Sequence, residues 1–164
     1  YWKQRKRIGA LHEKASNRRK DFLHKLSRKV ADTYDAVIVE DLNLRDLSRM
    51  LMFGKNVHDN GFGMFRTMLS YKLKDQGKVL VKVDRFFPSS KRCCGCYHIN
   101  KELELGERYW RCHVCGAVHY RDKNACYNLL QEGEVLLNRW TGGDSALILT
   151  PEGVLSAKKT ISAE

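Results

Sequence analysis

The amino-acid sequence predicts an α/β fold that carries a small cysteine-rich insertion. Apolar residues recur with a helical period across residues 3–33, which is typical of a long amphipathic helix. Two short runs, "DAVIVEDL" at 35–42 and "KVLVKVDRFF" at 78–87, are rich in β-branched residues and typical of strands. All 6 cysteines lie between residues 93 and 126. Helices that alternate with buried strands favour an α/β architecture.

Length, composition and charge restrict the class of protein. A chain of 164 residues with 43% hydrophobic residues can form one core, with room for a small inserted module. Its 30 Lys and Arg against 19 Asp and Glu give a net charge of +11, which favours a polyanionic partner, most often nucleic acid. From charge alone, a merely basic soluble protein is an equally good interpretation. No apolar run reaches membrane-spanning length and no signal peptide is recognisable, so we expect a cytoplasmic chain with no membrane partner and reduced thiols.

The helix over residues 3–33 combines an apolar stripe with a strongly basic surface. The stripe is predicted to contain Ile8, Leu11, Ala15, Phe22, Leu26 and Val30. Charged helix faces are commonly just solvated, but so many cations on one helix also form a plausible track for phosphates. The candidate nucleic-acid contacts on this helix are Lys14, Arg18, Arg19, Lys25 and Arg28.

The strand predicted at 35–42 ends in two carboxylates. Its continuous apolar run favours a buried central strand, and active residues of α/β folds commonly follow such strands. Because side chains alternate along a strand, Glu40 shares a face with Ala36 and Ile38, whereas Asp41 points to the other face. One of the two carboxylates should face a site; a solvated strand end is an equally good interpretation of this stretch alone.

The remaining elements are a second helix, a second strand and a final helix. The second helix should use Phe62, Phe65, Leu69 and Leu73 as its core face and end at Gly77 as a C-cap. Pro88 ends the second strand. Residues 122–140 are predicted to be helical, with an apolar face formed by Leu129, Leu130, Leu137 and Trp140. Residues 141–164 show no steady period and are interpreted as a tail.

Four cysteines have the spacing of a structural zinc site. Cys93 and Cys96 form one Cys-x-x-Cys pair, and Cys112 and Cys115 form another after 15 intervening residues. Each pair is a turn that directs two sulfurs at one point, and Gly116 suits the tight bend after the second pair. Four protein ligands leave a zinc ion no open position, so the predicted role is structural.

Other residues near the cysteine pairs are less suitable as ligands. Using Cys94 in place of Cys93 would shorten its pair to Cys-x-Cys. His98, His113 and His119 are possible substitutes that a four-cysteine site does not need. Cys126 lies off the pattern and is expected to be a small buried residue. A disulfide interpretation would require an oxidising compartment, for which the sequence gives no sign.

Asp122 follows the cysteine pairs and begins "DKNACYNLL", a helix-start pattern. Asp is a strong N-cap, and from the local sequence alone a capping role is the better interpretation.

Three strings together resemble a known family. In order and spacing, "VIVEDLN", "GKVLVKVDRFFPSSKRCCGC" and "YWRCHVCGAVHYRDKNACYNLL" are similar to the C-terminal half of TnpB (OrfB) proteins. These transposase-class proteins are encoded by bacterial insertion sequences and are related to compact type V CRISPR nucleases. The resemblance covers residues 3–130 and is highly specific in its "PSSK", "WRC" and "RDKNA" segments.

The resemblance implies a RuvC-type, RNase H-like fold and guide-RNA-directed cleavage of DNA. It divides the chain into a nuclease core at 1–87, a zinc ribbon at 88–121, a last helix at 122–140 and a tail at 141–164. The family's middle and last acidic residues match Glu40 and Asp122, which would bind catalytic Mg²⁺ beside the structural zinc. Phosphodiester cleavage by this fold uses clustered carboxylates that hold two Mg²⁺ ions about 4 Å apart. The ribbon could also contact nucleic acid through Lys91, Arg92 and Arg111.

The chain departs from the family pattern in three places. No Gly-Ile-Asp type segment, which carries the family's first catalytic Asp, precedes the basic helix, and the chain starts at Tyr1, so we expect an incomplete fold. Tyr97 stands where the family commonly has a glycine, which predicts strain in the first cysteine turn. Tyr120 stands where family members often have a second acidic residue, directly before the Arg-Asp pair.

The departures leave three functional hypotheses open. The chain belongs to a metal-dependent DNA endonuclease, or it is a nucleic-acid-binding zinc-ribbon remnant without nuclease activity. The third hypothesis, a zinc-ribbon protein of the translation machinery, is disfavoured by the "AVIVED" strand and two long helices.

Overall fold

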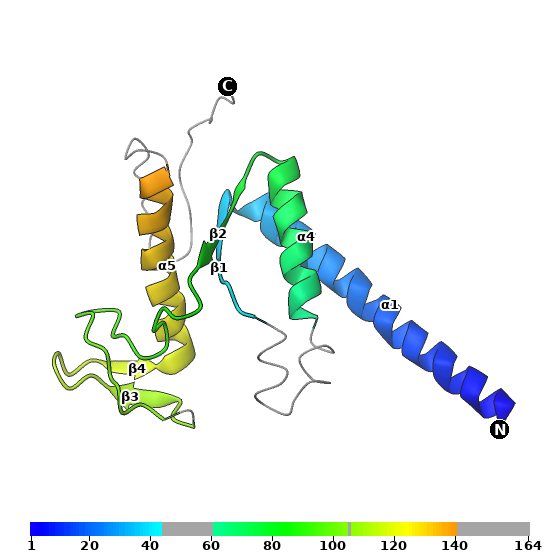
Figure 1. The fold of residues 1–164 in the computed structure, drawn as a ribbon, viewed down its shortest axis with the longest axis horizontal. Coiled ribbons are helices and arrows are strands. Elements are labelled where there is room, and N and C mark those ends of the chain that lie inside the picture. Colours follow the sequence, from blue (N-terminus) through cyan, green and yellow to red (C-terminus); the bar gives the residue numbers. More distant parts are fainter. Residues whose placement is uncertain (44–60, 105, 141–164) are drawn as a thin grey trace. The chain divides into compact units, whose positions relative to one another are not determined.

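The computed structural model describes residues 1–43, 61–104 and 106–140 and divides the chain into two compact units. The first unit holds Tyr1–Val37 and Leu42–Leu80, and the second holds Ile38–Asp41 and Val81–Glu164. In chain order the elements are α1 (Trp2–Thr33), β1 (Ala36–Glu40), α4 (Phe62–Asp75), β2 (Val79–Val83), β3 (Tyr109–Arg111), β4 (Val118–Tyr120) and α5 (Arg121–Trp140) (Figure 1). Residues 44–60, residue 105 and the predicted tail at 141–164 lie outside the described residues. Across the described part of the chain, no helix combines the length and the apolar character needed to cross a membrane.

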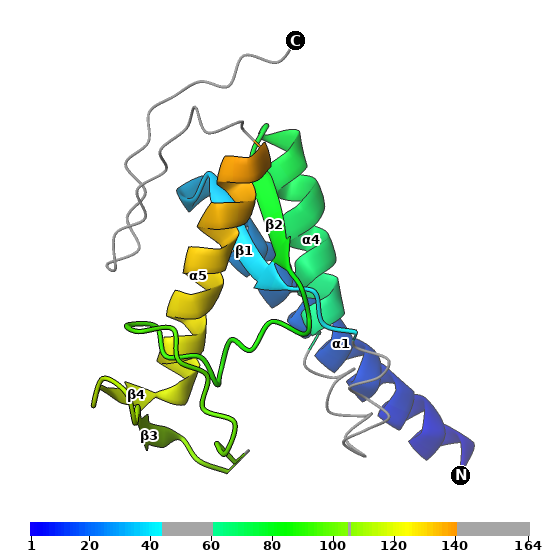
Figure 2. The same cartoon turned by 60° about the vertical axis from the view of Figure 1, so that its left-hand side comes forward.

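In the first unit, α4 packs against the C-terminal part of α1 (Figures 1 and 2). The core of this pair is formed by Ala31 of α1 and by Leu69 and Leu73 of α4. Partly buried hydrophobic residues around it are Val30, Val37, Phe65 and Leu80. Of the predicted core face of α4, Phe62 is the exception, because 56% of its surface is exposed.

The predicted apolar stripe of α1 is wrong for most of its residues, although Val30 packs against the core as expected. The buried residues of the helix are Leu23, Ser27 and Ala31, which recur every four residues and face α4. Four residues of the predicted stripe, Ile8, Leu11, Phe22 and Leu26, are exposed in the structure. The centre of the packed face is Ser27, a polar residue. Apolar periodicity therefore does not detect this face and selects the neighbouring one instead.

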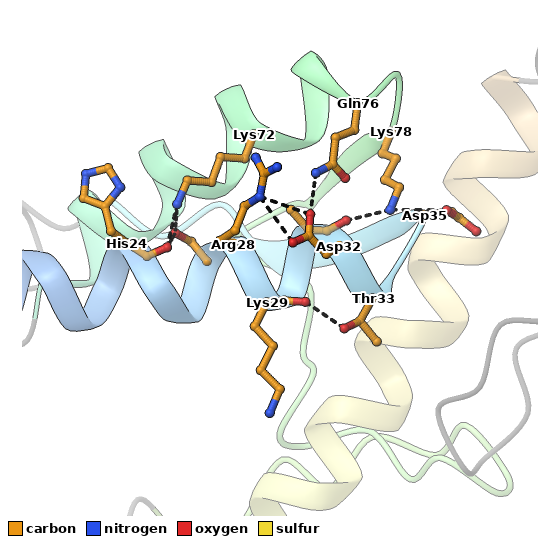
Figure 3. A network of polar contacts seen from close by, with 11 residues as sticks. His24, Arg28, Lys29, Asp32, Thr33, Asp35, Lys72, Gln76 and Lys78 are labelled. Atoms are coloured by element: carbon orange, nitrogen blue, oxygen red, sulfur yellow. Dashed lines mark hydrogen bonds and ion pairs between the residues drawn. The ribbon is translucent and has the colours of Figure 1, made fainter.

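Ser27 accepts a hydrogen bond from the buried ammonium group of Lys72. Figure 3 shows Lys72 reaching from α4 toward His24 of α1. Lys72 Nζ donates hydrogen bonds to Ser27 Oγ at 2.8 Å and to the His24 carbonyl at 2.6 Å. Ser27 Oγ in turn donates to the Leu23 carbonyl at 2.6 Å. Burial, assisted by the positive charge of Arg28, lowers the pKa of Lys72. A charged group taken out of water needs such partners, which is why a polar residue occupies the centre of the helix interface.

The C-terminal end of α4 closes as predicted. Gly77 has a φ of 67°. The Gly77 N–H donates to the Lys74 carbonyl at 3.0 Å, and the Lys78 N–H donates to the Leu73 carbonyl at 2.8 Å. The C-cap residue is Gln76, so the predicted C-cap is displaced by one residue. A left-handed glycine directly after the C-cap with this double closure is a common helix ending, and it confirms that α4 ends at Gly77.

Strands β1 and β2 pair in parallel. The Val79 N–H donates to the Asp35 carbonyl at 3.0 Å, and the Asp41 N–H donates to the Val83 carbonyl at 2.9 Å, so both strands advance in the same direction. Prediction and structure differ on burial, because all 5 residues of β1 are only half-buried. Within the described residues β1 pairs with β2 alone, which leaves it less enclosed than the predicted central strand.

In the second unit, an antiparallel hairpin leads directly into α5. β3 pairs with β4 so that Trp110 lies opposite His119 and Tyr109 lies opposite Tyr120. The inward face carries the buried Trp110 and His119, whose ring centroids are 4.8 Å apart. The hairpin lies at the N-terminal end of α5 in both ribbon views (Figures 1 and 2). The core around the hairpin is small and consists of Cys93, Leu103, Trp110 and Cys112.

Candidate functional site

The four predicted cysteine ligands meet at one point. The sulfur atoms of Cys93, Cys96, Cys112 and Cys115 all lie within 4.8 Å of one another. Cys93 Sγ is 3.6 Å from Cys115 Sγ, and Cys96 Sγ is 3.5 Å from Cys112 Sγ. Tetrahedral zinc with Zn–S bonds of about 2.3 Å requires sulfur separations of about 3.8 Å. The donor set and its spacing therefore fit a zinc ion.

Two turns of the same design present these sulfurs. After the first pair, the Tyr97 N–H donates to the Cys93 carbonyl at 2.9 Å; after the second, the Gly116 N–H donates to the Cys112 carbonyl at 2.9 Å. Both residues that follow the pairs have positive φ, 64° for Tyr97 and 73° for Gly116. Glycine adopts this conformation without strain, whereas a side chain disfavours it. The strain predicted at Tyr97 is thus present in the structure.

The aromatic ring of Tyr97 has a compensating contact. The guanidinium carbon of Arg92 lies 4.4 Å from the Tyr97 ring centroid and 5.4 Å from that of Phe87. Cation–π contacts of this kind contribute about 0.5–1 kcal/mol at exposed sites. Arg92, predicted as a nucleic-acid contact, is therefore half-buried between two rings rather than extended toward solvent.

The crowded thiols ionise unequally. The backbone N–H of Cys115 is the main reason why the pKa of Cys112 is lowered to about 6. The backbone N–H of His98 acts to lower the pKa of Cys96, but burial and hydrogen bonding with Cys112 and the other thiols outweigh it and raise this pKa to about 12. Four adjacent thiolates repel one another, so a cation is needed to hold all of them ionised.

Cysteine and histidine neighbours complete the surroundings of the cluster. His119 Nε2 lies 3.1 Å from Cys93 Sγ, and burial lowers the pKa of His119, so this ring is suited to support the sulfur from outside the ligand group. Cys94 lies outside the cluster, as predicted. The prediction for Cys126 is wrong, because this thiol is exposed on α5. Its position on the helix lies away from the core-facing residues Asn124 and Asn128.

Glu40 occupies the carboxyl end of β1. Its side chain is half-buried, and Glu40 Oε1 accepts a hydrogen bond from Ser89 Oγ at 2.5 Å. Asp41, the neighbouring carboxylate, instead lines a cavity of about 540 Å³ together with Asp84, Glu132 and Phe86. The expected split of the two carboxylates between different surroundings is thus observed.

Asp122 lies in the first turn of α5 rather than at its N-cap. A carboxylate there is stabilised by the unpaired N–H groups of the helix start. Arg108 Nη1 also forms an ion pair with Asp122 Oδ2 at 2.8 Å, and Arg121 Nε lies 3.7 Å from Asp122 Oδ1. The side chain remains 51% exposed. The pairing with Arg108 is a feature that sequence inspection missed, because it joins residues on opposite sides of the hairpin.

Glu40 and Asp122 belong to the same compact unit but have different hydrogen-bond partners. Within the described ranges, the four cysteines are the one group of three or more potential ligands close enough to hold a metal ion. The magnesium role of the two carboxylates therefore stays a prediction.

The predicted nucleic-acid contacts differ in their surroundings. Lys14 and Arg18 are exposed on α1, and Arg19 is half-buried. Lys25 pairs with Asp21 at 2.7 Å and Arg28 pairs with Asp32 at 3.2 Å, both across one helical turn (Figure 3 shows the second pair). On the ribbon, Arg111 is exposed, and Lys91 Nζ donates to the Lys101 carbonyl at 3.2 Å.

Two buried asparagines of α5 were also missed as structural residues. Asn124 and Asn128 are 2% and 0% exposed and bind the backbone before and after Cys93. Asn124 belongs to the "RDKNA" string, but its type gives no indication that it is buried, since asparagine is mostly a surface residue.

Two family models match the chain. Residues 1–51 match a model described as "Probable transposase" (OrfB_IS605), and residues 62–129 match the "Cas12f1-like, TNB domain". The chain belongs to the TnpB/OrfB family. Family membership agrees with the resemblance carried by the cysteine and Arg-Asp strings.

Individual relatives support the assignment. The chain is 40% identical over 131 residues to a Streptomyces pristinaespiralis protein named "Putative RNA-guided DNA endonuclease", covering 80% of this chain and 32% of that protein. It is 27% identical to the CRISPR-associated endodeoxyribonuclease Cas12f1 of Sulfoacidibacillus thermotolerans, covering 77% of this chain and 30% of that protein. The chain thus spans about a third of the length of these relatives.

A solved structure shares the fold. A chain in a Cas12f1–sgRNA–target DNA complex superposes with a TM-score of 0.61 and 23% identity, covering 77% of this chain and 37% of that chain. This TnpB/OrfB chain therefore has the α/β fold of the corresponding part of Cas12f1.

Proposed function

We propose that this chain forms part of the catalytic domain of an RNA-guided DNA endonuclease, with Glu40 and Asp122 as Mg²⁺ ligands and the cysteine cluster as a structural zinc site. The observation that carries the proposal is the position of the two carboxylates. Glu40 ends β1 and Asp122 lies in the first turn of α5, within one compact unit of a TnpB/OrfB chain. A RuvC-type fold is supported by the parallel β1–β2 pair and by the cysteine ribbon that precedes α5.

The residues of the chain have separable roles in this proposal. Glu40 and Asp122 would hold Mg²⁺, which would supply activation of the attacking water and stabilisation of the leaving oxygen in phosphodiester cleavage. Glu40 keeps one carboxylate oxygen free of the Ser89 hydroxyl, so this oxygen can serve as a ligand. Arg108 and Arg121 would compete with a cation for Asp122, because one guanidinium group lies against each of its two carboxylate oxygens. Exposed cations of α1, such as Lys14 and Arg18, provide non-specific affinity for phosphates.

Mg²⁺-dependent cleavage of single-stranded DNA by the zinc-loaded chain tests the proposal. Glu40→Gln and Asp122→Asn should each lower the cleavage rate more than about 100-fold, since even residues behind the metal ligands are commonly worth 10–100-fold. Asp75→Asn, which neutralises an exposed carboxylate at the end of α4, is the matched control and should retain the wild-type rate. Undiminished cleavage by either ligand variant contradicts the site assignment.

The Arg108–Asp122 ion pair favours a second candidate function, nucleic-acid binding without cleavage. In this alternative the guanidinium permanently neutralises a carboxylate that the nuclease would need. A site with only two carboxylates would also hold Mg²⁺ weakly. The same assay separates the candidates: salt-sensitive DNA binding with zinc present and without cleavage would support the second one.

A further inference from the structure

We propose that Ser89 positions the Glu40 carboxylate and that the buried Asn128 places Ser89, so that the orientation of Glu40 depends on the loaded cysteine ribbon. The inference deepens the proposed function by naming residues that would act through Glu40. It rests on the contacts among one strand end, one loop and one helix of the second compact unit.

The first contact is the hydrogen bond from Ser89 to Glu40. Ser89 is 7% exposed and its hydroxyl lies 2.5 Å from Glu40 Oε1. Among the described residues, Ser89 is the one hydrogen-bond partner of the Glu40 side chain. When a buried hydroxyl fixes one oxygen of a carboxylate, the other oxygen is held in one orientation. A metal ligand needs such a fixed orientation.

The second contact is made by Asn128 and fixes the backbone of Ser89. Asn128 Nδ2 donates to the Ser89 carbonyl at 2.8 Å and to the Arg92 carbonyl at 2.6 Å, so one amide group spans the turn between them. Asn128 is fully buried, and its bond to the Ser89 carbonyl is shielded from water. Such bonds are costly to break because a carbonyl would remain buried without a partner.

The third contact extends the connection to the cysteine cluster. Asn124 Nδ2 donates to the same Arg92 carbonyl at 2.6 Å, and Asn124 Oδ1 accepts from the Cys94 N–H at 3.0 Å. These two groups flank Cys93, a fully buried member of the cluster. Asn124 and Asn128 are four residues apart and therefore share one face of α5.

A single helix thus fixes three features of the proposed site. Its first turn carries Asp122, and its buried face holds the loop that runs from Ser89, the partner of Glu40, to Cys93. Because the loop is short and bonded at both ends, a displacement of Cys93 on loss of the metal should be transmitted to Ser89. The ribbon would then serve to orient a carboxylate in addition to stabilising the fold.

The experiment follows the Glu40 carboxylate directly by ¹³C NMR of the full chain with labelled glutamate side chains. The Glu40 signal is assigned by its absence in Glu40→Gln. Ser89→Ala should shift the signal, whereas Ser89→Thr keeps the hydroxyl and should restore the wild-type position. Ser90→Ala, the same change one residue later at a half-buried position, is the matched control and should leave the signal in place.

Asn128→Leu tests the connection without removing a cysteine. It keeps the branched shape of the side chain but removes the amide donor of both hydrogen bonds, so the Glu40 signal should shift while the zinc content stays at that of the wild-type chain. Zinc removal by a chelator should shift the signal in the same direction. An unchanged Glu40 signal in zinc-loaded Asn128→Leu, or in Ser89→Ala, would overturn the inference.

These measurements are independent of catalysis. A shift in Ser89→Ala combined with absent DNA cleavage would refute the proposed nuclease function and leave the positioning of Glu40 intact. Cleavage that persists with an unmoved Glu40 signal would refute the positioning alone.

Discussion

At the scale of single residues, the two cysteine turns show how backbone conformation limits sequence. Both require a positive φ directly after the second cysteine, and the chain meets the requirement once with Gly116 and once with Tyr97. Tyr97 bears the strain and gains the Arg92 contact, whereas Gly116 has neither strain nor a side chain to pack.

Gly116→Ala should destabilise the zinc-loaded protein by about 1–2 kcal/mol, the usual cost of a left-handed conformation for a residue with a Cβ atom. Nothing lies within 4 Å of the added Cβ, so steric overlap does not contribute to this cost. Thermal unfolding measures it, with Gly106→Ala as the control, because Gly106 also has open space but no positive φ. Equal melting temperatures for the two variants would contradict the explanation.

The unequal thiols predict how the metal-free, reduced protein responds to pH. For Cys112 the pKa falls from 9.0 to about 6, so its stabilising contribution is complete above pH 9 and is lost as pH falls toward 6. For Cys96 the pKa rises from 9.0 to about 12, so its contribution is complete below pH 9 and is lost as pH rises toward 12. The melting temperature should therefore be highest near pH 9.

Two serine variants check the assignment. Cys112→Ser should abolish the rise in melting temperature between pH 6 and pH 9, because it removes the group with the lowered pKa. Cys126→Ser changes an exposed thiol outside the cluster and should keep that rise. A rise that survives in Cys112→Ser would show that another group titrates.

At the scale of elements, helix α5 is fitted closely to strand β1. A Cβ atom at Gly133 would lie 2.5 Å from Ile38 Cγ1, which is well inside contact distance. Since Ile38 and Glu40 belong to the same strand, this close approach helps to place the carboxylate at the end of β1.

For Gly133→Ala, the contact with Ile38 decides whether the free energy of unfolding rises or falls. In an unobstructed helix the change would stabilise by about 0.5–1 kcal/mol, because glycine is a poor helix former. Here overpacking against Ile38 should dominate and destabilise by about 1–3 kcal/mol. Combining it with Ile38→Ala should recover part of the loss, measured by denaturant unfolding in a double-mutant cycle. A stabilising single variant would refute the close contact.

The α1–α4 interface includes the buried Ser27–Lys72 hydrogen bond. Ser27→Ala leaves the buried ammonium with only the His24 carbonyl of the two partners described, and should cost about 1.5–3 kcal/mol, the range for hydrogen bonds to charged groups. Ser16→Ala, on the exposed part of the same helix, should change the unfolding free energy by less than about 0.5 kcal/mol. Equal unfolding free energies for the two variants would contradict the role of Ser27.

At the scale of the whole molecule, local patterns were predictable and long-range partners were not. The cysteine cluster and the Gly77 helix end follow from spacing and from backbone chemistry within a few residues. The packed face of α1 could not be predicted from apolar periodicity, because its central residue, Ser27, is polar. Ser27 is suited to this position because it accepts a hydrogen bond from Lys72, which is 45 residues away in the sequence.

The surroundings of the two carboxylates show the same limit. Glu40 meets a hydroxyl 49 residues away, and Asp122 meets a guanidinium across the hairpin. The identities of Glu40 and Asp122 came from a family pattern, and their partners could come only from the fold. The exposure of Cys126 could likewise come only from the fold, because it depends on which face of α5 packs against the rest of the unit.

The central claim is that Glu40 and Asp122 bind the same catalytic metal ions, and Mn²⁺ titration followed by ¹³C NMR of the side-chain carboxylates tests it most directly. Mn²⁺ prefers the same carboxylate ligands as Mg²⁺ and broadens the signals of groups that it binds. We predict that both signals broaden together, that excess Mg²⁺ reverses the effect, and that Asp122→Asn greatly reduces broadening at Glu40. Broadening at Glu40 that is unchanged in Asp122→Asn would contradict a shared metal site.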